Sequence, residues 1–171
     1  SGGIRMVVTD GAGSGAAVTD VLDVLGGTGN VGLGSGAMGI ALTTGTDNVA
    51  IGEAALDAVT TGSDNVAVGD NAMGANNGGN YNVAIGSGSL ELNTTGTQNV
   101  AVGYAAMQTN VDGDNSTALG NYALYTQEPA SNVDMHNVAV GYYSMYGLTV
   151  GTQNTAVGSF TLDAAVTGSA N

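Results

Sequence analysis

Hydrophobic and small residues recur along this chain in one short phrase, Asn-Val-Ala-(Val/Ile)-Gly, that returns every 17 residues. Regular copies begin at Asn48, Asn65, Asn82, Asn99 and Ser116. After one longer step of 21 residues they resume at Asn137 and Asn154, and a looser first copy begins at Asn30. Such a period predicts stacked units that bury a core only against their neighbours. Paired helices are the main alternative, but they need about 30 residues or more and fewer glycines. The pattern therefore favours a β-solenoid.

One repeat, residues 48–64, shows how a single turn of the solenoid (a rung) is expected to fold. Val49, Ala50 and Ile51 alternate as in a β-strand, and β-branched residues dominate the second and fourth positions of every copy. We expect these two positions to point inward, with Leu56 at the ninth position closing the core from a facing strand. The predicted core is Val49, Ile51, Leu56, Val66, Val68, Met73, Val83, Ile85, Leu90, Val100, Val102 and Met107.

Glycine recurs at the fifth position of each copy and again near the fifteenth. A turn that needs positive φ, or a close approach of two backbones, explains a glycine at a constant offset. The predicted turn glycines are Gly52, Gly62, Gly69, Gly86, Gly96, Gly103, Gly120, Gly141 and Gly158. The rung is thus expected to run strand, turn, strand, turn in an all-β, parallel solenoid. The opening Asn either forms a ladder of stacked amides or only favours a turn.

Two segments depart from the period. Residues 1–29 are predicted to be an N-terminal cap or a degenerate rung, and residues 30–171 to form the solenoid. The longer step places an inserted loop at 126–136, which holds the only Pro and the only His of the chain. An insertion of this kind is either a binding loop or a neutral bulge.

The small residues at the third and eighth positions, such as Ala50 and Ala55, are expected to lie on an outward face. Small side chains let a second backbone approach closely, and one rung alone buries few large aliphatic side chains. We therefore expect this face to pack against identical chains, most simply in a parallel homotrimer.

Charge and composition exclude several functions. Fourteen acidic residues against one Arg give a formal charge of −13, which disfavours nucleic acid. No apolar run approaches the length that spans a membrane, so no membrane insertion is expected. The chain has no Cys and one His, and the stacked carboxylates of Glu53 and Asp70 lack aromatic subsites and a cationic neighbour. We expect no enzymatic activity and no required cofactor.

Two groups of residues are candidate sites. Aromatic residues follow the fifth-position glycine in the later rungs and form a stripe suited to stacking on sugar rings, or simply on one another: Tyr104, Tyr122, Tyr142, Tyr143 and Phe160. Carboxylates next to glycine-rich turns are typical of calcium β-rolls, and Ca²⁺ could bind at Asp47 with Asp64, or at Asp112 with Asp114.

The phrases NVAIG at 48–52 and 82–86 and NVAVG at 65–69, 99–103 and 137–141 resemble the head repeats of YadA-like trimeric autotransporter adhesins. Together with TTGSDN at 60–65 and TTGTQN at 94–99, they also resemble repeats of bacteriophage tail fibres. The resemblance implies a left-handed β-roll of three chains around one axis. It also implies display outside a cell or on a virion, where the fibre attaches to a cell-surface glycan or protein receptor. A self-assembling extracellular filament or sheath subunit and a secreted calcium-binding β-roll are the alternatives.

Overall fold

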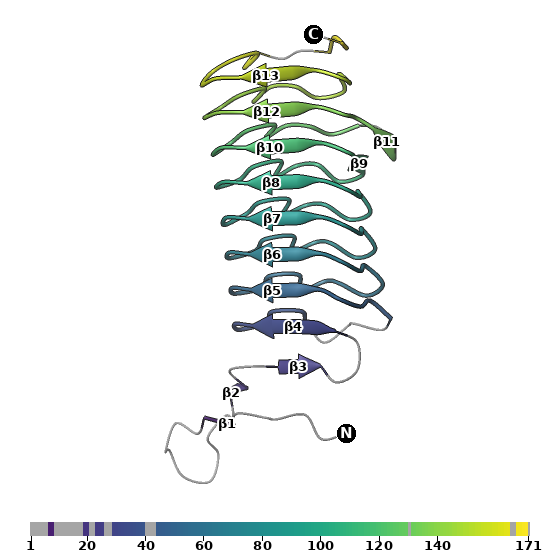
Figure 1. Cartoon of the computed structure of the whole chain (residues 1–171), viewed down its shortest axis with the longest axis vertical. Coiled ribbons are helices and arrows are strands. Elements are labelled where there is room, and N and C mark those ends of the chain that lie inside the picture. Colours follow the sequence, from purple (N-terminus) through teal and green to yellow (C-terminus); the bar gives the residue numbers. More distant parts are fainter. Residues whose placement is uncertain are drawn as a thin grey trace.

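The computed structural model describes residues 7–8, 19–20, 23–25, 29–39, 44–129, 131–164 and 167–170. These residues contain β-strands and turns and no helix. Nine strands form one sheet that runs along the stack of rungs (Figure 1). Its members are β3 (Asp23–Leu25), β4 (Asn30–Leu33), β5 (Val49–Ile51), β6 (Val66–Val68), β7 (Val83–Ile85), β8 (Val100–Val102), β10 (Thr117–Leu119), β12 (Val138–Val140) and β13 (Thr155–Val157).

Successive rungs pair in parallel from β4 to β13, and equivalent positions of the repeat lie opposite one another. Ala50 of β5 pairs with Ala67 of β6, for example, and Val83 of β7 pairs with Val100 of β8. The register is kept across the longer step, because Ala118 of β10 pairs with Ala139 of β12. The predicted all-β, parallel β-solenoid with 17-residue rungs is confirmed.

The first strand of this sheet is an exception, because β3 pairs antiparallel with β4. Two further strands, β1 (Val7–Val8) and β2 (Thr19–Asp20), form a separate antiparallel pair. Most of the predicted cap, residues 1–29, lies outside the described residues.

The predicted inward and outward faces of the strand are reversed. The third-position alanines are buried, whereas the second- and fourth-position residues are partly or well exposed, with Ile51 at 38% and Ile85 at 41%. The prediction of a core position was therefore wrong for Val49, Ile51, Val66, Val68, Val83, Ile85, Val100 and Val102. The prediction that the alanines of the third and eighth positions form an outward face was also wrong, since Ala50, Ala55, Ala67 and Ala72 are buried.

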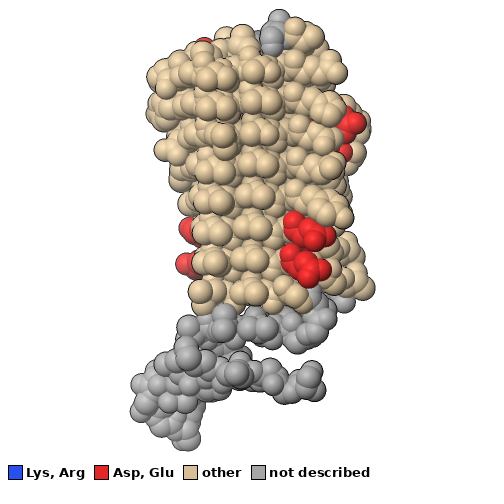
Figure 2. Space-filling model, viewed as in Figure 1, with Lys and Arg blue, Asp and Glu red and all other residues tan. Residues whose placement is uncertain are grey.

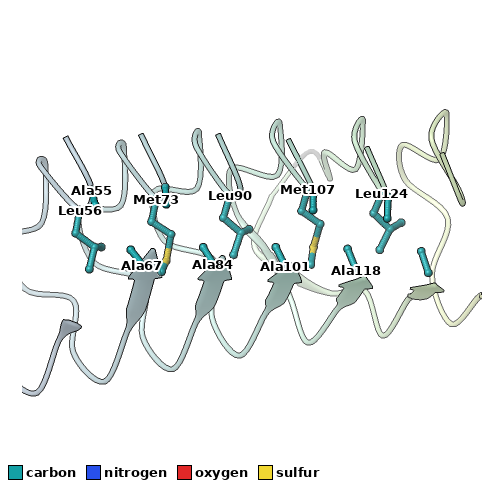
Figure 3. Close-up of a cluster of buried hydrophobic side chains, with 14 of the residues drawn as sticks. Ala55, Leu56, Ala67, Met73, Ala84, Leu90, Ala101, Met107, Ala118 and Leu124 are labelled. Atoms are coloured by element: carbon teal, nitrogen blue, oxygen red, sulfur yellow. The ribbon is translucent and has the colours of Figure 1, made fainter. Parts of the chain in front are cut away.

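The reason is the narrow interior of the coil. The ninth-position side chains fill it from the opposite wall, and Leu56, Met73, Leu90 and Met107 are completely buried, as predicted. Figure 3 shows them facing the alanines of the strands, one large residue against one small residue in each rung. At Gly32, which holds the third position of its rung, an added Cβ would lie 2.9 Å from Cγ of Met38. A β-branched side chain at this position would exceed the available volume.

The opposite wall is not the facing strand that we predicted. Residues 53–58 and their equivalents are turns with a recurring left-handed backbone at the seventh and ninth positions, where φ is 50° for Ala54 and 51° for Leu56. These turns still bond from rung to rung: the Leu56 N–H donates to the Ala72 carbonyl at 3.1 Å. The second wall is thus a stack of identical turns.

The glycine corners follow the prediction. Gly52, Gly69, Gly86, Gly103, Gly120, Gly141 and Gly158 all have φ between 129° and 137°. At Gly86, a Cβ would lie 2.5 Å from the carbonyl oxygen of Gly103 in the next rung. Positive φ and close backbone approach therefore both require glycine here.

The opening asparagines form the buried amide ladder. In each regular rung the Asn side chain donates from Nδ2 to a glycine carbonyl 14 residues later, as Asn65 does to Gly79 at 2.8 Å. Its Oδ1 accepts from the N–H of the next opening residue, as Asn65 does from Asn82 at 3.0 Å. One side chain thus closes its own rung and joins it to the next.

Candidate functional site

The corner after the fifth-position glycine presents the aromatic residues. Tyr122, Tyr143 and Phe160 occupy the seventh position with φ of 60°, 56° and 59°. Because Ala54 and Ala105 adopt the same left-handed conformation at this position, the strain belongs to the architecture of the coil and is no mark of function by itself.

The structure brings the five predicted aromatic residues together. Ring centroids are 5.3 Å apart for Tyr104 and Tyr122, 4.8 Å for Tyr122 and Tyr143, and 4.5 Å for Tyr142 and Tyr143. Phe160 lies 5.4 Å from Tyr142 and 5.6 Å from Tyr143. Each pair joins two rungs or two neighbours within one rung. The residues therefore form a continuous patch along one corner of the solenoid.

Two further tyrosines complete this patch and were missed in the sequence analysis. Tyr125 and Tyr146 occupy the tenth position of successive rungs, and their rings stack at 5.1 Å with an interplanar angle of 9°. Tyr146 also stacks on Tyr143 at 4.7 Å. Their shared offset within the repeat was the available signal. We call Tyr104, Tyr122, Tyr125, Tyr142, Tyr143, Tyr146 and Phe160 the aromatic cluster.

The aromatic cluster has an exposed outer part and a half-buried inner part. Tyr104, Tyr142 and Phe160 are 50%, 46% and 56% exposed, whereas Tyr122 and Tyr143 are half-buried. Burial, together with neighbouring phenols, raises the pKa of Tyr122 and of Tyr143 above the ordinary value of 10.0. Both phenols are therefore neutral at neutral pH, and the patch offers uncharged ring edges and hydroxyl groups.

The predicted calcium ligands are separated into two places, and two of them already accept hydrogen bonds. Oδ1 of Asp112 accepts from the hydroxyls of Thr94 at 3.0 Å and Thr95 at 2.7 Å. Oδ1 of Asp114, which is buried, accepts from the N–H of Thr97 at 2.6 Å. Asp47 and Asp64 are exposed at equivalent positions of adjacent rungs. Within the described part of the chain, no group of three or more His, Asp or Glu side chains could hold a metal ion.

The inserted loop only partly projects from the rod. Gln127 and Met135 are completely buried, whereas Ser131, Asn132, Val133 and Asp134 are exposed. A short strand β11 (Val133–Asp134) pairs in parallel with β9 (Gly113–Asp114) of the preceding rung. Figure 1 shows β11 at the side of the solenoid, away from the long sheet. The insertion therefore fills part of the core and adds a small surface strand.

The second and fourth positions of strands β4 to β13 form a regular surface along the sheet, which we call the outer sheet face. Its side chains are Val31, Leu33, Val49, Ile51, Val66, Val68, Val83, Ile85, Val100, Val102, Thr117, Leu119, Val138, Val140, Thr155 and Val157. No charged residue occurs among them. In Figure 2 the region that carries the strands of Figure 1 has no Asp, Glu, Lys or Arg, and acidic residues lie to either side of it.

Among the described residues, no helix is long and apolar enough to cross a membrane. Comparisons of the chain with protein-family models, with curated proteins and with solved structures gave no match.

Proposed function

We propose that this chain is a non-enzymatic, rod-shaped attachment segment that works as a parallel homotrimer outside a cell or on a virion. In this proposal the three outer sheet faces meet at the common axis, and the aromatic cluster contacts a glycan or protein receptor. The resemblance of the repeats to adhesin heads and tail fibres supports the attachment role. The uncharged outer sheet face is the structural observation that carries the proposal.

The composition of this face is unusual for a protein of this charge. The chain carries 14 acidic residues, yet the outer sheet face has none, and its residues are almost all Val, Ile or Leu. Contiguous exposed apolar surface of this kind marks a protein interface. Burying it removes hydrocarbon from water at roughly 25 cal/mol per Å².

A second copy of the same chain is the partner that fits this face best. The rungs repeat at about the 4.8 Å spacing of paired strands, and a parallel identical chain repeats its side chains at the same spacing. Three copies around one axis cover all three faces and leave no further copy to add. The packing surface is therefore the Val and Ile columns rather than the alanine columns that the sequence suggested.

The oligomeric state tests the first part of the proposal. Sedimentation or light scattering is expected to give three times the 16.6 kDa chain mass. Ile85→Lys on the outer sheet face should give monomers. Leu92→Lys replaces another exposed aliphatic residue, 44% exposed on the wall of turns, and should keep the trimer. A monomeric wild type, or an Ile85→Lys variant that keeps the wild-type mass, would refute the proposed interface.

Binding of the labelled trimer to whole cells tests the second part. The double variant Tyr142→Ser, Phe160→Ser should bind less. Tyr81→Ser should bind as the wild type does, because Tyr81 is exposed but lies at the last position of the rung that begins at Asn65, outside the aromatic cluster. Equal binding by both variants would remove the aromatic cluster from the proposal. Electron micrographs that show long polymers instead of short rods would favour the filament alternative.

A further inference from the structure

Apart from Tyr81, the aromatic cluster contains the tyrosines of the described residues, which are side chains that a one-electron oxidant can attack. The chain has no Cys and no Trp. In the part that the structure describes, the methionines are at most 1% exposed: Met38, Met73, Met107, Met135 and Met145. A one-electron oxidant in solution therefore meets phenols first, among them Tyr104 and Tyr142 at about half exposure.

Ring contacts connect these exposed phenols to an inner stacked pair. Tyr142 lies 4.5 Å from Tyr143, Tyr143 lies 4.7 Å from Tyr146, and Tyr146 lies 5.1 Å from Tyr125. The planes of Tyr125 and Tyr146 differ by 9°. An electron lost at Tyr142 can be replaced through this chain of rings, so that the radical reaches the inner pair.

We propose that Tyr125 and Tyr146 form a dityrosine cross-link when a haem peroxidase and hydrogen peroxide act on the protein. Each phenol gives up one electron and one proton, and the two phenoxyl radicals join through a carbon–carbon bond between carbons ortho to the hydroxyls. Each coupled ring carbon then loses its hydrogen as a proton, which returns to the ring oxygen and restores the phenol. The two electrons and two protons that are released reduce one peroxide to two water molecules.

The position of this pair gives the cross-link a structural role that does not depend on the proposed function. Tyr125 and Tyr146 come from two successive rungs, and the chain between them contains the inserted loop. Rungs of a solenoid contact only their neighbours, so the stack can open between two adjacent rungs. A chain without Cys has no disulfide to prevent this separation. A dityrosine bond between Tyr125 and Tyr146 would hold these two rungs together. It would also stabilise the fold by restricting the conformations of the unfolded chain.

The experiment treats a dilute solution of the 171-residue chain with a haem peroxidase and peroxide and measures dityrosine fluorescence, intact mass and cross-linked peptides. We expect one chain to lose two hydrogen atoms and a peptide map to join residues 125 and 146. The melting temperature should rise by roughly 6 °C or more, from the loop-closure effect and the usual conversion for a chain of this size.

Variants and a denatured control decide the outcome. Tyr146→Phe keeps the ring packing and should abolish the mapped link, and Tyr142→Phe should slow its formation. Tyr81→Phe, at a tyrosine 62% exposed with no aromatic partner in the described residues, should change neither. The link should be lost when the oxidation is done on the denatured chain. Links that map only to Tyr81, an equal yield of the 125–146 link from folded and denatured protein, or no dityrosine at all would overturn the proposal.

Discussion

Oε1 of Gln127 accepts a hydrogen bond from Nδ2 of Asn137 at 2.9 Å, in the rung that begins with Ser116 instead of Asn. In two earlier rungs, Oδ1 of the preceding Asn accepts this bond: Asn30 accepts it from Asn48 and Asn48 accepts it from Asn65, both at 3.0 Å. Ser116 is too short for this role, and its hydroxyl instead bonds to Gln127 at 3.2 Å. Gln127 thus supplies, from the other side of the interior, the acceptor that an Asn at position 116 would supply.

Gln127 also belongs to a second buried ladder, formed by the amides at the twelfth position. Asn93 donates to Asn76 at 3.0 Å, Asn110 donates to Asn93 at 3.4 Å, and Gln127 donates to Asn110 at 3.0 Å. The longer Gln side chain therefore joins both ladders in the irregular rung. Met135 from the insertion packs near the same point, 3.1 Å from where a Cβ of Gly113 would lie.

Replacing Gln127 by Ala should therefore be costly. The change removes the donor to Oδ1 of Asn110 and one of the acceptors of Asn137, and both of these side chains are buried. A buried polar group that is left unpaired costs about 1–3 kcal/mol. Urea denaturation should show a loss of about 2 kcal/mol or more in the free energy of unfolding. Gln98→Ala, at an exposed position of an earlier rung, is the matched control and should stay within about 0.5 kcal/mol of wild type. Similar values for the two variants would contradict this role of Gln127.

The orientation of the strand can be tested with adjacent residues. Ala84→Val adds two methyl groups to a filled interior and should lower the free energy of unfolding by about 1–3 kcal/mol. Val83→Thr lies on the outer sheet face, where Thr117 and Thr155 already occupy the same column, and should change it by about 0.5 kcal/mol or less. Both are best measured on the Ile85→Lys background, so that association does not contribute. A larger loss for Val83→Thr would restore the original assignment of faces.

Two glycines of different surroundings test the corner geometry. Gly86→Ala forces a Cβ to within 2.5 Å of a carbonyl oxygen at φ 131°, and should cost at least about 2 kcal/mol. Gly74→Ala meets its nearest neighbour, the Asn71 carbonyl oxygen, at 3.5 Å, which is ordinary contact. By reducing the entropy of the unfolded chain, it should be neutral or stabilising by up to about 1 kcal/mol. Thermal melts of both variants measure the difference. Equal losses of stability would exclude a special role of the glycine at the fifth position.

The half-buried phenols predict a dependence of stability on alkaline pH. The folded-state pKa values of Tyr122 and Tyr143 are raised above 10.0, so the unfolded chain releases these protons at a lower pH than the folded chain does. Well below pH 10.0 both phenols keep their protons in the folded and the unfolded chain, so the stabilisation of the folded state is fully present. The free energy of unfolding then falls as the pH rises from about 10.0 through the folded-state pKa values. Melting curves at increasing pH should show this fall. The double variant Tyr122→Phe, Tyr143→Phe should show a shallower one, and an unchanged slope would count against the raised pKa values.

The sequence by itself determined the 17-residue period of the rungs and their glycine corners, and it offered an amide ladder as one of two explanations of the opening Asn. A glycine at a constant offset needs positive φ or close backbone approach, and an Asn at a constant offset meets its own copy one rung away, whatever the rest of the coil does. Even the stripe of Tyr104, Tyr122, Tyr142, Tyr143 and Phe160 followed from the period, because equal offsets lie above one another.

Only the tertiary structure decided which face of the strand is inside. The alternation of Val49, Ala50 and Ile51 fits a strand with either face turned inward. The larger hydrophobic side chains of Val49 and Ile51 favoured the wrong face. The distance to the opposite wall, which Leu56 and its equivalents already fill, leaves room only for Ala. The same holds for Gln127, whose partners come from its own rung and from both neighbouring rungs, and whose length matters only across an interior of this width.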